Sequence, residues 1–182
     1  MNIYKITILF IVLSISGSTL YAQDEPSVRD NFVTINFLAP GFKYERGLGA
    51  TSTININPGL GFSFLFSSNS GSDFAVQPYV DVQLRKYYNL AARSALGKNA
   101  ANNSGNFFAL DIVGVFPAIA ESDNIDTGSG YAIGPVWGMQ RTYASGFNLS
   151  LHVGIGYASD EFDSNGATLL TGLTLGFALN RD

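Results

Sequence analysis

Two residues of the sequence have the types and spacing of a hydrolytic pair, Ser150 and His152. A histidine can take the proton of a serine hydroxyl, and an acidic side chain can then hold the imidazole in place. In a strand, residues two apart lie on the same face. The alternative, which we favour, is an interior histidine with a structural role. The sequence therefore predicts no catalytic residue.

Five charged residues form a second set that could act together. Each lies in a run in which apolar and polar residues alternate, at a polar position. In a strand these positions lie on one face, so the five residues would share the polar face of a sheet with His152. Charges enclosed in a narrow, low-dielectric space must be paired, because an unpaired buried ion is very costly. Two cations against three anions favour a structural network that blocks the interior, and a gated or ion-selective path is the alternative. The five residues are Lys43, Glu45, Asp81, Arg85 and Asp111.

The composition excludes several kinds of site and partner. The chain has no cysteine, which excludes disulfides, thiolate metal sites and cysteine nucleophiles. Its net charge of −4 argues against nucleic acid as a partner. Acidic residues gather in the expected loops at residues 119–129 and 158–166, where Ca²⁺ could bind, but EF-hand spacing is absent. We expect solvated loops there, with no cofactor and no metal site.

The first 22 residues have the order of a secretory signal peptide. A short segment with one positive charge precedes the apolar run at residues 6–15, and small and polar residues follow it up to Ala22. A membrane anchor is the alternative, but a spanning helix needs about 20 apolar residues. The sequence therefore predicts cleavage after Ala22, a mobile polar leader at residues 23–30 and one domain at residues 31–182.

Apolar and polar residues alternate along most of this domain. The clearest run is at residues 54–66, and such alternation is the signature of a strand with two unlike faces. The run is longer than the five or six residues of an ordinary strand and suits a tilted strand that crosses a membrane. The pattern predicts eight strands, at residues 33–37, 42–45, 54–66, 74–85, 108–116, 131–140, 147–157 and 169–179.

The distribution of charge indicates which face of these strands points inward. Charged residues make up 13% of the chain, where about a quarter is usual. A solvated face normally carries Lys and Glu, whereas the polar face here is rich in Gly, Ser, Asn and Gln, as in the crowded interior of a small barrel. The sequence thus predicts an all-β, up-and-down antiparallel transmembrane β-barrel of about eight strands. One short helix is expected at residues 90–98, in an inner connection.

Several short motifs resemble small outer-membrane β-barrel proteins of Gram-negative bacteria, especially an uncharacterised family of the Bacteroidetes group. They are the junction at residues 21–23 and the segments at residues 41–46, 86–89 and 102–106. The resemblance implies an eight-stranded barrel that the outer-membrane insertion machinery places in the membrane, and it implies no assigned activity. Such proteins commonly end in an aromatic residue on the last strand, whereas this chain continues past Phe177.

Ser150 and His152 also resemble the catalytic pair of lipid A deacylases and outer-membrane phospholipases. The longer signature around that pair is absent from this sequence, and both residues are predicted to face inward rather than toward lipid.

We therefore expect a non-enzymatic, monomeric barrel of the outer membrane with a side-chain-filled lumen and a structural or interaction role at the cell surface. Its expected contacts are outer-membrane lipid and lipopolysaccharide. Two alternatives stay open: a narrow, porin-like channel or transporter for small solutes, and an exported soluble barrel of lipocalin type that binds a ligand.

Overall fold

A computed structural model describes residues 26–67, 71–123 and 127–180 of the chain, and every structural statement below refers to these residues. The predicted signal peptide and the first residues of the predicted leader lie outside them.

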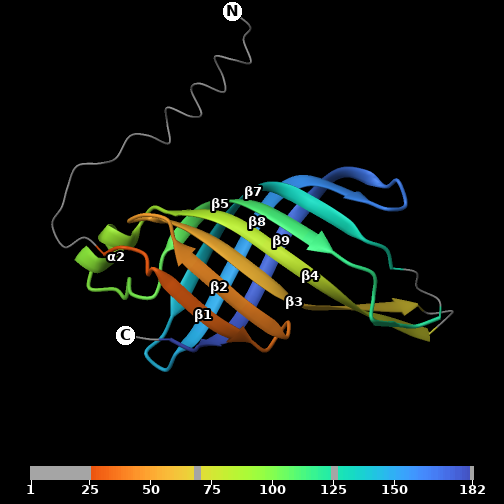
Figure 1. The fold of residues 1–182 in the computed structure, drawn as a ribbon, viewed down its shortest axis with the longest axis horizontal. Helices are drawn as coiled ribbons and strands as arrows, with labels where there is room; N and C mark the ends of the chain where they lie inside the picture. The colour runs from red at the N-terminus through yellow and green to blue at the C-terminus, as the bar shows by residue number, and fades with distance from the viewer. Residues whose placement is uncertain (1–25, 68–70, 124–126, 181–182) are drawn as a thin grey trace, which may run out of the picture.

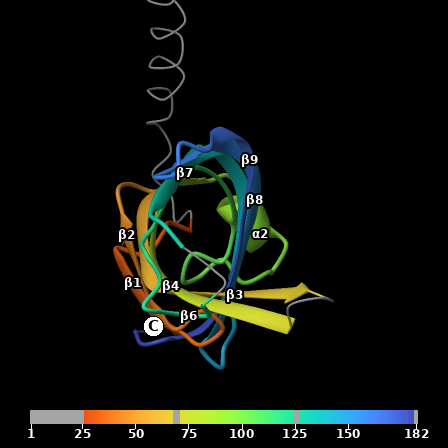
Figure 2. The ribbon, with the colours of Figure 1, turned by 90° about the vertical axis from the view of Figure 1, so that its right-hand side faces the viewer.

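Eight strands form a closed antiparallel ring, which Figure 2 shows from one end (Figures 1 and 2). Each strand of the ring pairs with the next along the chain, and β1 pairs with β9 to close it. Every predicted run of alternation overlaps one of these strands, so the predicted up-and-down antiparallel ring is confirmed. The strands are β1 (Asn31–Asn36), β2 (Gly41–Gly47), β3 (Ser52–Ser67), β4 (Gly71–Tyr87), β5 (Asn106–Val115), β7 (Gly130–Thr142), β8 (Phe147–Asp160) and β9 (Asn165–Ala178).

Two short elements lie outside the ring. The helix α2 (Leu90–Ala95) confirms the predicted helix but is shorter, because the backbone turns at Gly97, whose φ of +67° favours glycine. The strand β6 (Ala120–Glu121) lies in a segment predicted as a loop and pairs with Ala75 and Val76 of β4. Among the described residues, no helix has the length and hydropathy needed to span a membrane.

The two ends of the ring differ. We call one the α2 end, since it holds α2, the turns at residues 48–51 and 143–146 and both ends of the described chain (Figure 1). The other is the loop end, with the described ends of the β3–β4 hairpin, residues 116–123 and 127–129 and the turn at residues 161–164. β3 and β4 pair without a break from Ser52↔Lys86 to Ser67↔Gly71, so their hairpin projects beyond the shorter strands.

The described part of the predicted leader is held against the α2 end. Val28 is buried, and its N–H donates a hydrogen bond to the carbonyl of Ala50 over 2.9 Å. The backbone N–H of Arg29 donates to Oδ1 of Asn103 over 2.7 Å. Residues 26–30 therefore make contacts with the α2 end that their polarity does not predict, and the mobility of the leader stays a prediction.

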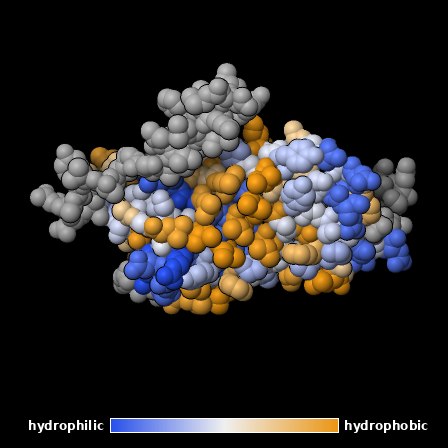
Figure 3. Space-filling view, turned by 45° about the horizontal axis from the view of Figure 1, so that its top comes forward, coloured by the Kyte–Doolittle hydropathy of each residue, from blue (hydrophilic) through white to orange (hydrophobic). Residues whose placement is uncertain are grey.

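The alternation of the strands places polar side chains inside the ring and apolar side chains outside. On β8, Ser150 and His152 are buried, whereas Val153 is 43% exposed and Ile155 is 71% exposed. Most buried side chains are polar or charged, and each of the eight ring strands exposes large hydrophobic side chains. Figure 3 shows hydrophobic side chains gathered in the middle of one face and hydrophilic ones toward the two ends. This arrangement is the reverse of that in a soluble barrel.

Two of the three prolines inside the described strands coincide with gaps in strand pairing, whereas Pro78 lies in the unbroken ladder between β3 and β4. The pairing of β7 with β8 is interrupted at Pro135, between Ile133↔Tyr157 and Val136↔Gly154. The pairing of β2 with β3 is likewise interrupted between Gly41↔Gly59 and Tyr44↔Ile56, where Pro58 lies opposite Phe42. A proline has no N–H to donate, so each gap lies where that donor is missing.

Candidate functional site

The six residues that the sequence singles out are all buried inside the ring, and each is at most 8% exposed. They come from four strands and separate into two groups along the lumen. We call the first group the Glu45 cluster; it contains Lys43, Glu45 and Arg85. The second, the Asp111 group, contains Asp81, Asp111 and His152.

Glu45 is the centre of the first group. Its Oε1 accepts hydrogen bonds from the hydroxyls of Thr53, over 2.7 Å, and Tyr87, over 2.8 Å. Its Oε2 accepts from Nε2 of Gln140 over 3.0 Å and lies 3.5 Å from Nη1 of Arg85. Both oxygens of this fully buried carboxylate are thus satisfied, as a buried charge requires.

Lys43 bonds to amides rather than to a carboxylate. Its Nζ donates to Oε1 of Gln140 over 2.7 Å and to Oδ1 of Asn148 over 2.6 Å. The expected network of two cations against three anions therefore takes a different form here, because Gln140 connects Lys43 to Glu45. Sequence reasoning missed Gln140 and Asn148, since a neutral amide gives no charge signal.

Arg85 completes the cluster on the side of β5. Its Nε donates to Oε1 of Gln83 over 2.7 Å, and its guanidinium carbon lies 4.4 Å from the centre of the Phe107 ring. Phe107 in turn packs against Tyr87, with ring centres 5.4 Å apart. Side chains from β2, β3, β4, β5, β7 and β8 thus meet across the lumen and fill it toward the α2 end.

The Asp111 group lies farther from the α2 end and is less well satisfied. Nε2 of His152 lies 3.4 Å from Oδ2 of Asp111, and Nδ1 lies 3.2 Å from the amide nitrogen of Gln83. Asp81 lies diagonally across from Asp111, because Gln83 pairs with Asp111 and Asp81 pairs with Val113. Oδ1 of Asp81 and both oxygens of Asp111 are buried without a donor from a neutral or cationic side chain within hydrogen-bond distance, and the two carboxyl groups lie within hydrogen-bond reach of each other.

Ser150 and His152 share the inward face of β8, as predicted. The contacts of the His152 ring are to Asp111 and Gln83, and neither is to Ser150. Both residues are buried inside the ring, away from the apolar exterior where a lipid ester would lie. The geometry therefore assembles an acid–histidine pair without a nucleophile that a lipid can reach.

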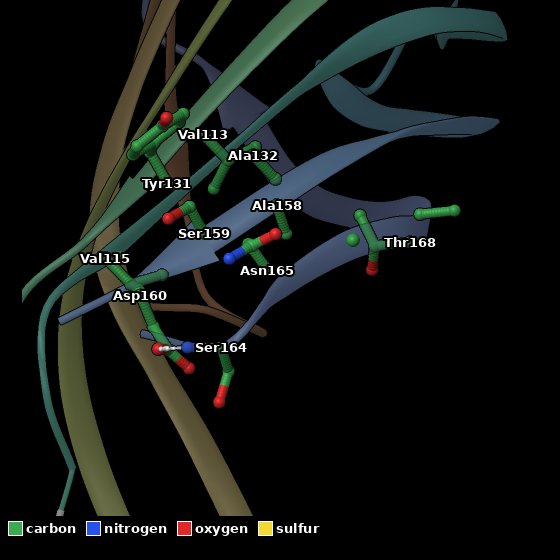
Figure 4. Close-up of a pocket in the computed structure, with 13 residues that line it drawn as sticks. Val113, Val115, Tyr131, Ala132, Ala158, Ser159, Asp160, Ser164, Asn165 and Thr168 are labelled. Carbon is green, nitrogen blue, oxygen red and sulfur yellow. Dashed lines mark hydrogen bonds between the residues drawn. The ribbon is translucent and has the colours of Figure 1, made fainter. Parts of the chain in front are cut away.

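A pocket opens inside the ring at the loop end. Its volume is about 420 Å³, and Figure 4 shows side chains of β5, β7, β8 and β9 around it. The lumen-facing residues of its wall are small: Val113, Val115, Ala132, Ala158 and Thr168. Sequence reasoning missed this pocket, although small residues near one end of several polar faces are its signal.

Charge is divided between the two ends. Within the described ranges, the Lys and Arg side chains lie in the lumen or at the α2 end, and the loop end carries acidic residues alone. These are Asp73, Glu121, Asp123, Asp160, Glu161 and Asp163. No group of three or more acidic or histidine side chains in the described part of the chain is arranged to hold a metal ion.

The chain belongs to a family described as "Protein of unknown function (DUF3575)", whose model matches residues 7–171. No curated protein and no solved structure matches the sequence.

Proposed function

We propose that this protein is an outer-membrane β-barrel of a Gram-negative bacterium, without enzymatic activity, whose lumen is closed by side chains. Its role is structural or one of interaction at the cell surface. A signal peptide at residues 1–22 exports it, the insertion machinery of the outer membrane places it there, and it works as a monomer. Its contacts are lipid and lipopolysaccharide.

The apolar exterior carries this proposal. Large hydrophobic side chains are exposed on all eight ring strands, including Phe108 at 59% and Leu169 at 65%. A soluble protein rarely exposes an apolar surface of this extent, because water makes it costly. Hydrocarbon is the environment in which an apolar exterior and a hydrogen-bonded, edgeless ring are both favourable.

The Glu45 cluster supports a closed lumen. Its side chains and the partners that they contact come from six of the eight ring strands, and the Glu45 carboxylate and the Lys43 ammonium hydrogen-bond across the interior. A water-filled channel of this strand number would have no room beside them. This observation favours a structural or interaction role over a channel.

A charge placed on the exterior tests the membrane environment directly. Val153 lies in the middle of β8 and faces outward. In hydrocarbon, Val153→Arg costs about 2–4 kcal/mol, which should lower the amount of folded, heat-modifiable barrel in the outer-membrane fraction. The matched control is Leu96→Arg in the turn after α2, which is 72% exposed and lies beyond the strands.

We expect Leu96→Arg to accumulate like the wild type and Val153→Arg to be depleted. Recovery of the wild type as a soluble periplasmic monomer, with both variants equally abundant, would show that the barrel is not in a membrane. An exposed valine on a soluble barrel tolerates arginine at little cost.

A further inference from the structure

The lumen is filled toward the α2 end and open toward the loop end. The pocket at the loop end has a volume of about 420 Å³, which lies in the range of small-molecule sites. Its wall is made mainly of methyl and methylene groups, with Val113 and Ala132 on paired strands and Ala158 directly opposite Ala132. Such a wall favours an apolar group of modest size.

The pocket ends inside the ring. Below Ala132 on β7, the lumen-facing positions are Gly134 and then Val136. Below Thr168 on β9, the next lumen-facing residue is Leu170. Val136 and Leu170 are both buried in one apolar cluster. Beyond them the Glu45 cluster fills the lumen. A ligand can therefore enter and leave by the loop end, and the site is a cup rather than a passage.

The charge at the mouth selects the sign of the ligand. Asp160 lines the pocket, and Glu161 lines the adjoining hollow together with Ser129. The described part of the loop end has no Lys or Arg to balance these acids. A cation is attracted to this mouth and an anion is repelled.

Two neighbouring buried acids lie below the wall of the pocket. On β5, Asp111 is the next lumen-facing residue after Val113, about 7 Å farther from the loop end. Both of its carboxylate oxygens and Oδ1 of Asp81 are buried; their contacts are that of Asp111 with His152, at 3.4 Å, and a hydrogen bond between the two carboxyl groups, which requires a proton on one of them. Two buried acids this close repel each other when both are ionised, and a primary ammonium group supplies a positive charge and three donors.

We propose that the loop-end pocket binds a small primary amine with an apolar body. The apolar body occupies the space between Val113, Ala132 and Ala158, and the ammonium group points toward Asp111. This proposal rests on the ring and its interior, and it holds in a membrane or in water.

Binding of 4-phenylbutylamine to the purified full barrel in lipid nanodiscs tests the proposal, with 4-phenylbutyrate and 4-phenylbutanol as ligands of equal size and different charge. The readouts are calorimetry and the NMR shifts of the Ala132 and Ala158 methyl groups. Ala132→Phe fills the pocket, and Asp111→Asn removes the acceptor charge. Ala91→Phe, on exposed α2, introduces the same side chain at the far end of the molecule.

We expect the amine to bind at least about tenfold more tightly than the carboxylate and to shift both alanine methyl signals. Ala132→Phe should abolish binding and Ala91→Phe should retain it. Asp111→Asn should weaken the amine about tenfold and leave the alcohol unchanged. If Ala132→Phe does not give a heat-modifiable barrel, Ala158→Phe takes its place. If neither variant folds, the shifts of the wild-type alanine methyl signals on addition of the amine decide whether it binds in this pocket.

Equal affinity for amine and carboxylate, unchanged binding to the filled pocket, or no binding at all would overturn the proposal. None of these results bears on the membrane location, which depends on the exterior residue Val153. Conversely, a barrel found to be soluble would be titrated in buffer with the same expected order of ligands.

Discussion

The interior of this barrel is organised around one carboxylate. Glu45 accepts hydrogen bonds from Thr53, Tyr87 and Gln140 and forms an ion pair with Arg85. These four partners lie on three different strands. A charge-assisted hydrogen bond in a dry interior is stronger than a neutral one, and its loss leaves the partners unsatisfied. The stability of the ring should therefore be more sensitive to Glu45 than to most interior positions.

Removing the Glu45 carboxylate should destabilise the barrel strongly. In Glu45→Ala, Arg85 stays buried without its counter-ion and two hydroxyls lose their acceptor, which costs about 3–5 kcal/mol. The measurement is the denaturant midpoint of unfolding in lipid vesicles, followed by the shift of the folded band on a gel.

The matched control for this substitution is Ser150→Ala. It also removes a buried polar side chain, but one without a charge. We expect a cost of about 1 kcal/mol for this variant. Equal midpoints for Glu45→Ala and the wild type would contradict a central role for the carboxylate.

The sequence predicts which residues face the interior better than it predicts which side chains they contact there. Alternation alone places Lys43, Glu45 and Arg85 on the inward face. Their partners depend on how far each strand is shifted along the ring, and that shift has no signal in a single strand. Lys43 therefore bonds to Gln140 and Asn148, although charge alone would pair it with an acid.

At the scale of elements, glycines allow the backbones of β7 and β8 to lie close together. A Cβ atom built on Gly154 would lie 2.1 Å from the carbonyl oxygen of Pro135, and one built on Gly134 would lie 2.2 Å from that of Ile155. Glycine is required here because the two backbones meet where Pro135 interrupts their pairing.

Gly154→Ala should therefore force β7 and β8 apart. We expect a loss of about 1–3 kcal/mol in the free energy of unfolding, as for an overpacked site. Gly114→Ala on β5 is the control, because a Cβ atom there has nothing within 4 Å. That variant should match the wild type or gain up to about 1 kcal/mol. Equal losses at both positions would show that the approach of the two strands is not the cause.

The ring elements are predictable because lumen and exterior differ so much in polarity that alternation survives along nearly the full length of each strand. The exceptions are local. α2 ends earlier than its sequence suggests because Gly97 turns the backbone, and β6 is too short for any periodicity to show. The described part of the leader, residues 26–30, is polar, yet Val28 is buried there and its backbone is hydrogen-bonded to the α2 end.

At the scale of the whole molecule, the barrel is closed toward one end and hollow toward the other. The filled half contains the Glu45 cluster, and the hollow half contains the loop-end pocket. A solute can occupy such a lumen without crossing it.

Reconstitution into planar bilayers should therefore give no steady conductance. We expect the folded barrel to leave the current at the level of a protein-free bilayer in salt solution, since the Glu45 cluster leaves no continuous water path. Recovery of heat-modifiable protein from the same lipid verifies that the barrel has inserted. Discrete, ion-selective current steps would instead favour the channel alternative.

The number of paired residues differs greatly from one pair of neighbouring strands to another. β3 pairs with β4 along all 16 of its residues, whereas the first and last strands pair at three positions, Thr34↔Ala178, Ile35↔Phe177 and Asn36↔Gly176. Few ladder bonds give a seam a low free energy of local opening. Until that seam joins, the sheet has two bare edges able to pair with another chain. We therefore expect the seam between β1 and β9 to be the first part of the ring to open, and its two edges to need protection during assembly until the ring closes.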